Sequence, residues 1–263
     1  MLSKLKQKYQ MMRARNITEL SDYRRQLVEI PNAVFLHWQA TAKNEFPGIP
    51  SDAVFFTRAA EGLMMFFSCV QRSKQACALP SKAADSVWHA WNDWSSIHLD
   101  KFCCKHFGST IPHVEAEHMA SKIDLALANC LVTAQRAEGS WPGSPSVPHL
   151  FALDGKLHMP HGYSYFATSA RIGFQNMNSR GVGAGKSTYP ESFGAAQLLA
   201  AGLLSTLSYE EMVKKQAQAA NNGSSCGSSG SSSGDNGSCD SGGGSCDGGG
   251  SSCGGGCGGG CGS

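Results

Sequence analysis

The last 42 residues, Asn222 to Ser263, constrain this chain more than any other part of it. They contain 18 Gly, 13 Ser, 6 Cys, 3 Asp and 2 Asn, and cysteine is their only apolar side chain. Such a segment buries too little surface to offset the entropy of ordering a chain that is nearly half glycine. We therefore predict a disordered tail and a folded body of 221 residues, which is enough for a hydrophobic core.

The first two thirds of the body have the pattern of amphipathic helices. Apolar residues recur at three- and four-residue steps from about residue 18 to residue 138. We expect Pro31 to end one helix, and Ser51 and Ser81 to cap the next two. These features predict a mainly α fold.

Three tryptophans, Trp88, Trp91 and Trp94, lie within seven residues on the helix that Ser81 is expected to begin. Their spacing predicts a buried face. Ser95 or Ser96 is expected to open a further helix that stops at Gly108.

The chain changes character after Gly139, where four prolines fall between residues 142 and 160. The segment Leu150–Met159 places Asp154-Gly155 between two short apolar runs, a pattern typical of a β-hairpin. A last helix is expected from about Phe193 to Ala220. The predicted organisation is a helical domain (1–139), a loop and hairpin region with a terminal helix packing on it (140–221), and the tail (222–263).

One glycine-rich stretch imitates a nucleotide-binding loop. Gly181–Thr188 ends in Gly-Lys-Ser-Thr, but Arg180 stands where the first glycine of a P-loop is required. No hydrophobic strand precedes it, and Pro190 interrupts the segment where a helix would have to begin. We interpret the stretch as a flexible loop.

Charge and hydropathy limit the partners of the chain. The body carries 22 Lys+Arg against 17 acids, and five of the bases fall in residues 1–18 with no acid among them. Such an end could contact nucleic acid or an acidic membrane surface, although a solvated basic helix face is the simpler explanation. The longest apolar run, Phe193–Leu207, is shorter than the roughly 20 residues needed to cross a bilayer. We expect a cytoplasmic protein with no strong nucleic-acid signature and no transmembrane segment.

One group of residues in the helical region could carry chemistry. Asp85 and His89 are four residues apart and so share a helix face, where an acid would fix the tautomer of the histidine. Cys103 and His113 follow on the next helix and just after it. Two antiparallel helices could bring His89, Cys103 and His113 together as a metal or acid–base site.

This region also resembles the glycine-rich domain-containing (GRDP-like) proteins. The resemblance rests on Leu79–Trp91, with its P-S-x-x-x-D-x-x-W-H run, and on the Phe-Cys, glycine and histidine that follow, over roughly residues 50–120. It implies a helical domain often joined to a glycine-rich segment, and no established catalytic activity. The family's motif residues fall on Asp85, Trp88, His89, Cys103 and His113. A structural role, with Trp88 packed and His89 hydrogen-bonded across a helix pair, is the alternative to a metal or catalytic role.

The tail holds a second set of candidate ligands, which become denser toward the end of the chain. Thiolates on a glycine chain could wrap a soft d¹⁰ ion such as Zn²⁺ or Cu(I). Disulfide cross-linking, enzymatic modification and a plain spacer are the alternatives. The cysteines concerned are Cys226, Cys239, Cys246, Cys253, Cys257 and Cys261.

These observations favour a protein that binds a metal ion or a protein partner, with a thiol-rich tail, over an enzyme. An enzyme that uses His89 and Asp85, and a scaffold or precursor whose tail is modified or cross-linked, are the two rivals. The body cysteines lie mostly on apolar helix faces, so we expect free buried thiols in a reducing compartment.

Overall fold

The computed structural model describes residues 2–73, 75–113, 123–168 and 171–222. Contacts place Met1–Ser224 in one compact unit. The predicted disordered tail lies outside the described residues apart from Asn222, and its six cysteines lie outside them entirely.

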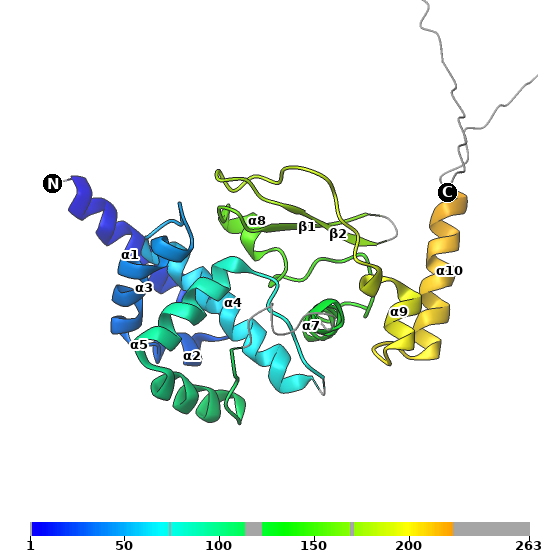
Figure 1. Cartoon of the computed structure of the whole chain (residues 1–263), viewed down its shortest axis with the longest axis horizontal. Coiled ribbons are helices and arrows are strands. Elements are labelled where there is room, and N and C mark those ends of the chain that lie inside the picture. The colour runs from blue at the N-terminus through cyan, green and yellow to red at the C-terminus, as the bar shows by residue number, and fades with distance from the viewer. Residues whose placement is uncertain (1, 74, 114–122, 169–170, 223–263) are drawn as a thin grey trace, which may run out of the picture. The chain divides into compact units, whose positions relative to one another are not determined.

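The described chain is mainly helical with one two-stranded antiparallel hairpin, as the sequence predicted (Figure 1). The helices of the first half are α1 (Leu2–Leu20), α2 (Arg24–Val28), α3 (Asn32–Glu45), α4 (Ala53–Arg72) and α5 (Lys82–Phe107). The remaining elements are α7 (Ile123–Ala137), α8 (Leu153–Leu157), β1 (Tyr163–Ala167), β2 (Ile172–Asn176), the 3₁₀ turn η2 (Glu191–Phe193), α9 (Ala195–Ala200) and α10 (Thr206–Asn222).

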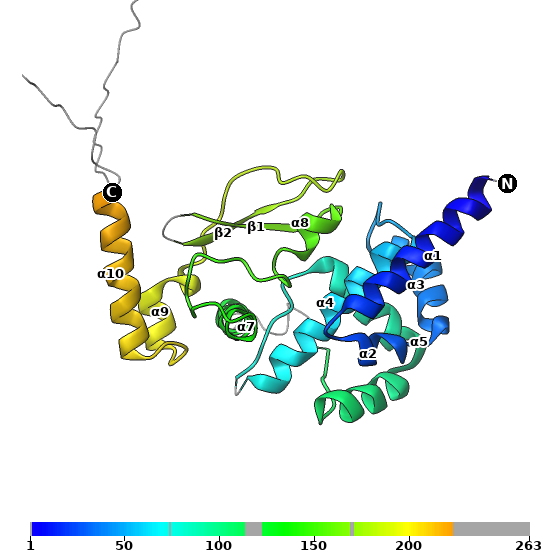
Figure 2. The ribbon, with the colours of Figure 1, turned by 180° about the vertical axis from the view of Figure 1, so that it is seen from behind.

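Helix α4 is the centre of the core. It packs against α5, α7 and α1, and seen from behind α1 lies across it (Figure 2). Its length and apolar composition would suit a membrane span, yet 72% of that window is buried inside the protein, so core packing explains the composition. Its cap is Asp52, whose carboxylate accepts from the backbone N–H groups of Val54 and Phe55, and not Ser51 as the sequence suggested.

Helix α5 begins, bends and ends where its sequence predicts. The Ser81 hydroxyl accepts from the backbone N–H of Ala84 and so caps the helix. Ser95 leaves helical geometry (φ −169°, ψ 99°) and its Oγ accepts from the N–H of His98, so a second segment starts there. Gly108, with φ of 84°, ends it in the left-handed conformation that glycine adopts at no steric cost.

The three tryptophans of α5 contribute to the core to different extents. Trp91 is 0% exposed and Trp88 is 4% exposed, whereas Trp94 is only partly buried. The Trp88 ring packs on Phe66 and Phe67 of α4, and the Trp91 ring packs on Phe102 in the second segment of α5. The predicted buried face is confirmed.

The β-hairpin is not where the sequence placed it. Leu153–Leu157 forms α8, and the strands lie further on, with Tyr163 paired to Asn176 and Ala167 to Ile172. The Asp-Gly pair that suggested a turn is therefore helical. The aspartate of this pair, Asp154, binds groups that are distant in sequence, which no local pattern reveals.

Asp154 on α8 is fully buried, and its carboxylate lies against the first turn of α5. Its carboxylate accepts from the Ser81 hydroxyl at 2.7 Å and from the backbone N–H groups of Lys82, Ala83 and Tyr163, each at 3.0 Å. Burial raises the pKa of Asp154, and the four hydrogen bonds oppose that shift. A negative group at a helix N-terminus also complements the helix dipole. Asp154 thus ties α5 to α8 and β1.

The last predicted helix is divided in two. Gly202 adopts a φ of 70°, its N–H bonds to the carbonyl of Leu199, and the N–H of Leu203 bonds to that of Leu198. This pair of bonds is a Schellman motif, which terminates a helix. One continuous helix from Phe193 to Ala220 was therefore a wrong prediction.

The stretch that imitates a P-loop is a loop that lies against the hairpin. Thr188 pairs with Phe174 and Gly183 with Met177 through isolated antiparallel bridges. A strand does precede it, because β2 ends at Asn176, but β2 belongs to an antiparallel hairpin and the loop is followed by the short turn η2, so the strand–loop–helix unit of a P-loop is not formed.

Candidate functional site

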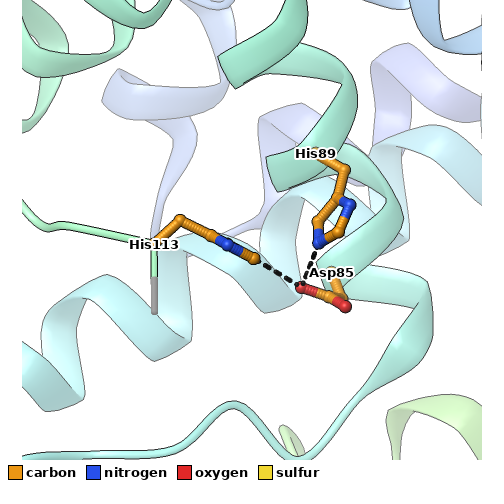
Figure 3. A group of neighbouring side chains, drawn as sticks. All are labelled: Asp85, His89 and His113. Carbon is orange, nitrogen blue, oxygen red and sulfur yellow. Dashed lines mark hydrogen bonds and ion pairs between the residues drawn. The ribbon is translucent and has the colours of Figure 1, made fainter. Parts of the chain in front are cut away.

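Three of the predicted site residues converge at one end of the helical core. Asp85 and His89 lie one turn apart on α5, and His113 lies on the segment that follows Ile111 (Figure 3). The possible ligand atoms of the three all lie within 4.8 Å of one another. Within the described part of the chain, this is the one such group of three or more histidine, cysteine or carboxylate side chains.

Both histidines direct the same nitrogen toward the same oxygen. Nε2 of His113 lies 3.1 Å from Oδ1 of Asp85, and Nε2 of His89 lies 3.5 Å from that atom (Figure 3). The imidazole rings stand nearly perpendicular, with their centroids 4.4 Å apart. Two ring nitrogens and one carboxylate oxygen therefore face a common point.

A fourth residue, Glu45, which the sequence analysis missed, contacts the ring nitrogen of His89 that does not face Asp85. Glu45 is the last residue of α3, and its Oε1 lies 2.6 Å from Nδ1 of His89. This ion pair places a carboxylate beside Nδ1, while Nε2 on the other side of the ring faces Asp85 and His113. Because Glu45 lies 44 positions before His89, no local spacing reveals the pair.

Aromatic rings fix both histidines on their other sides. The His113 ring meets the buried Trp88 edge to face, with centroids 4.5 Å apart. The His89 ring meets Phe46 in the same manner at 6.0 Å. The packing role expected for Trp88 is present, and it positions a site residue as well.

Two cavities adjoin the cluster and share Glu45. The first, of about 320 Å³, is lined by His89 and His113 together with Thr41, Asn92 and Asp93 among others. The second, of about 270 Å³, is lined by Asp85, Lys82 and His161 among others. The three side chains are therefore half-buried, and a small molecule or water can reach them.

Cys103 does not join the group. It lies on the second segment of α5, is 0% exposed, and packs in the core. Burial, assisted by the charge of Asp100, raises the pKa of its thiol to about 12. A thiol with so high a pKa loses its proton to a metal less readily than a free cysteine does, and Cys103 lies outside the group, so the geometry gives it a packing role.

The other body cysteines are free thiols, and Cys69 and Cys130 are buried, as expected. Cys130 hydrogen-bonds to both Cys69 and Cys77, which raises its own pKa and lowers that of Cys77. Cys104 is the exposed exception.

The donor set suits a transition-metal ion of the zinc type. Two imidazoles and a carboxylate are among the ligand combinations that bind Zn²⁺, with metal–ligand bonds of about 2.0–2.2 Å. Ligand atoms at the corners of a tetrahedron of that size are roughly 3.3–3.5 Å apart. The His89–Asp85 distance of 3.5 Å falls in this range, and the His113–Asp85 distance of 3.1 Å is slightly shorter.

The model of the UCP032817-like family matches residues 52–185, just over half of the chain. This chain belongs to the UCP032817-like family. Asp85, His89 and His113 all lie in the matched part, as does Asp154, whereas Glu45 and the tail lie outside it. Comparison with curated proteins found no match. Comparison with solved structures found none either.

Proposed function

We propose that this UCP032817-like protein binds a divalent transition-metal ion, of which Zn²⁺ is the best fit, through Asp85, His89 and His113. The observation that supports the proposal most is that both Nε2 atoms face one carboxylate oxygen. Of the two contacts, that of His113 is a hydrogen bond, whereas Nε2 of His89 lies 3.5 Å from the oxygen as an ion-pair contact. In a neutral His89 protonated on Nδ1, the lone pair of Nε2 is available for a cation at the common point.

Glu45 supports the same function from outside the ligand set. Histidine ligands of metal ions almost always donate the other ring N–H to a carboxylate, carbonyl or water, which fixes the tautomer and increases ligand basicity. Glu45, whose Oε1 lies 2.6 Å from Nδ1 of His89, places a carboxylate where such a partner acts. An exposed histidine–carboxylate pair elsewhere, His149 with Glu138 at 3.1 Å, lacks further ligands and serves as a matched control.

The test is calorimetric titration of the full chain with Zn²⁺, with the six tail cysteines replaced by serine. We expect one ion per chain, with affinity reduced about a hundredfold or more by Asp85→Asn or His113→Asn and unchanged by His149→Asn. Bound Zn²⁺ should also raise the melting temperature. If the site variants bind Zn²⁺ as the control does, Asp85 and the histidines form a structural hydrogen-bonded group, and the proposal is wrong.

A catalytic role is the second candidate, and one observation favours it. Three protein ligands leave a fourth position for water, the arrangement of catalytic rather than structural zinc sites, and the larger cavity lies against His89 and His113. A metal-bound hydroxide would make the site hydrolytic. Turnover of p-nitrophenyl acetate or p-nitrophenyl phosphate that is lost in His113→Asn and kept in His149→Asn would support it; equal background in both would exclude these two reactions.

Two finer proposals rest on the sequence alone. The GRDP-like resemblance of residues 50–120 assigns the same histidines to a family motif and agrees with a helical body joined to a glycine-rich segment. The tail, for which we propose capture of Zn²⁺ or Cu(I) by its thiolates, would be a second metal site in a cytoplasmic protein. Its thiols and the body site differ in ligand chemistry, so the two are separable by substitution.

A further inference from the structure

The outward face of α1 carries an apolar stripe. Leu5, Tyr9 and Met12 are 66%, 56% and 55% exposed, and their spacing of four and three residues places them on one side of the helix. Three large apolar side chains in a row on the surface of one helix are not explained by the core, to which none of them belongs.

The opposite side of the same helix is the one that packs on the protein. Ala14 is buried and Gln10 and Ile17 are half-buried, and α1 contacts α4 and α2. The turns before Ala14 contain no other buried residue among those described, and in both views they extend past the elements on which α1 packs (Figures 1 and 2). The stripe therefore faces away from the body and is free to meet a partner.

Basic side chains border the stripe on both sides. At 100° per residue, Lys6 and Arg13 lie along one edge and Lys8 and Arg15 along the other, and all four are exposed. The guanidinium of Arg13 lies 5.9 Å from the centre of the Tyr9 ring. The first acidic residue of the chain is Glu19, so no carboxylate neutralises these bases within the first four turns.

We propose that this face of α1 docks on the surface of an anionic lipid bilayer. A helix lies in the plane of a membrane interface when its apolar side chains enter the acyl boundary and Lys and Arg flank them. The long stems of these bases let their charged ends reach the headgroups, and each base near an anionic surface strengthens binding about fivefold. The exposed stripe supplies the apolar side chains and its two edges supply the bases.

A nucleic acid is the other polyanion that four bases would attract, and the stripe argues against it. Phosphate contacts need the bases alone, and an apolar row between them would lie against a polar backbone. A bilayer uses both features. The two partners are therefore distinguished by whether the apolar residues matter.

The test is flotation of the full chain with lipid vesicles. We expect binding to vesicles of phosphatidylcholine with about a third phosphatidylserine, weak binding to pure phosphatidylcholine, and release of the bound protein as salt screens the headgroup charge. The variant Leu5→Gln/Tyr9→Gln/Met12→Gln should bind at least about tenfold more weakly. Replacing Lys8 and Arg15 by Gln should lower binding about thirtyfold.

The matched controls replace exposed apolar or basic side chains outside α1. Val28→Gln with Leu36→Gln removes two side chains that are 59% and 54% exposed, and Lys101→Gln with Lys186→Gln removes two exposed bases; both pairs should bind as the parent does. Circular dichroism of each variant verifies that the helices remain. The proposal is overturned if anionic vesicles bind no protein, if the α1 and control variants bind alike, or if the chain binds double-stranded DNA or RNA with an affinity that the apolar triple variant leaves unchanged.

Discussion

Nε2 of His113 lies 3.1 Å from Oδ1 of Asp85, a residue 28 positions earlier in the chain. The contact brings the segment after α5 back onto the first half of that helix, where Asp85 and His89 are one turn apart. The fold thus places two histidines around one carboxylate oxygen, beside a cavity, and the candidate site arises from this convergence of three common residues.

Glu45 should control metal affinity without being a ligand. Replacing it by Gln keeps the size of the side chain and removes the charge beside Nδ1 of His89, so we expect affinity for Zn²⁺ to fall about 10–100-fold. Calorimetric titration measures the change. Glu138→Gln, which alters the pair with His149, is the control; equal effects of the two variants would remove Glu45 from the proposed site.

Trp91 should be the most costly of the α5 tryptophans to truncate. It is fully buried, its Nε1 donates to Nδ1 of His98 at 3.3 Å, and its ring packs against Phe102. Trp91→Ala should lower the free energy of unfolding by about 3–5 kcal/mol. Urea titration measures it, with the partly buried Trp94→Ala expected to cost clearly less; a reversed order would contradict the packing.

Asp154→Ala should destabilise the protein by about 3 kcal/mol or more. The substitution leaves the Ser81 hydroxyl and three backbone N–H groups buried without their acceptor. Asp154→Asn, which keeps one acceptor oxygen, should cost less. Thermal unfolding at neutral pH orders the three proteins; an alanine variant as stable as the parent would show that water replaces the carboxylate.

Adjacent cysteines on α5 should differ sharply in reactivity. Cys103 is 0% exposed with a pKa of about 12, whereas Cys104 is exposed. Iodoacetamide at pH 8 should therefore modify Cys104 in the folded protein and spare Cys103 until denaturant is added. Peptide mass spectrometry separates the two sites, and equal labelling would contradict the burial.

The raised pKa of Cys103 also makes the free energy of unfolding depend on pH. A thiol whose folded pKa exceeds its ordinary value of 9.0 contributes fully below pH 9, and the contribution is lost as pH rises toward 12. The stability advantage of the parent over Cys103→Ala should narrow across that window. If the stability of the parent relative to Cys103→Ala grows with pH instead, the thiol lies in a polar environment and the burial of Cys103 is contradicted.

The tail should take up Cu(I) through its closest cysteines. Cys253, Cys257 and Cys261 are separated by three residues each, which costs the least loop entropy. In the reduced full chain, replacing these three by serine should lower uptake more than replacing Cys226, Cys239 and Cys246. Affinity should rise with pH toward about 8.5, where free thiols ionise. Absence of uptake in the parent would favour cross-linking or modification.

Local chemistry made much of the fold predictable. Ser81, Ser95 and Gly108 mark the start, bend and end of α5 because each acts through backbone groups within three or four residues. The same reasoning failed at Asp154, where an Asp-Gly pair typical of turns is held by a helix 71 to 73 positions away. The domain boundary at residue 139 stays a prediction.

The candidate site was predictable in part for the same reason. Helical spacing joins Asp85 to His89, and the return of His113 follows from the short segment after Gly108. The relation of Glu45 to His89 depends on how α3 packs against α5, which a single sequence does not encode locally. Cys103 was included because the sequence marks the break at Ser95 without showing which way the second segment of α5 turns, and that segment packs Cys103 in the core.

The position of Asp154 in the chain sets an order of events during synthesis. A ribosome completes Glu45, Asp85, His89 and His113 before it reaches the carboxylate that receives the first N–H groups of α5. A nascent or truncated chain ending before residue 154 would contain Asp85, His89 and His113 yet lack the carboxylate that binds the first turn of their helix. If the body site binds metal as we propose, it should do so only after α8 and β1 have been synthesised.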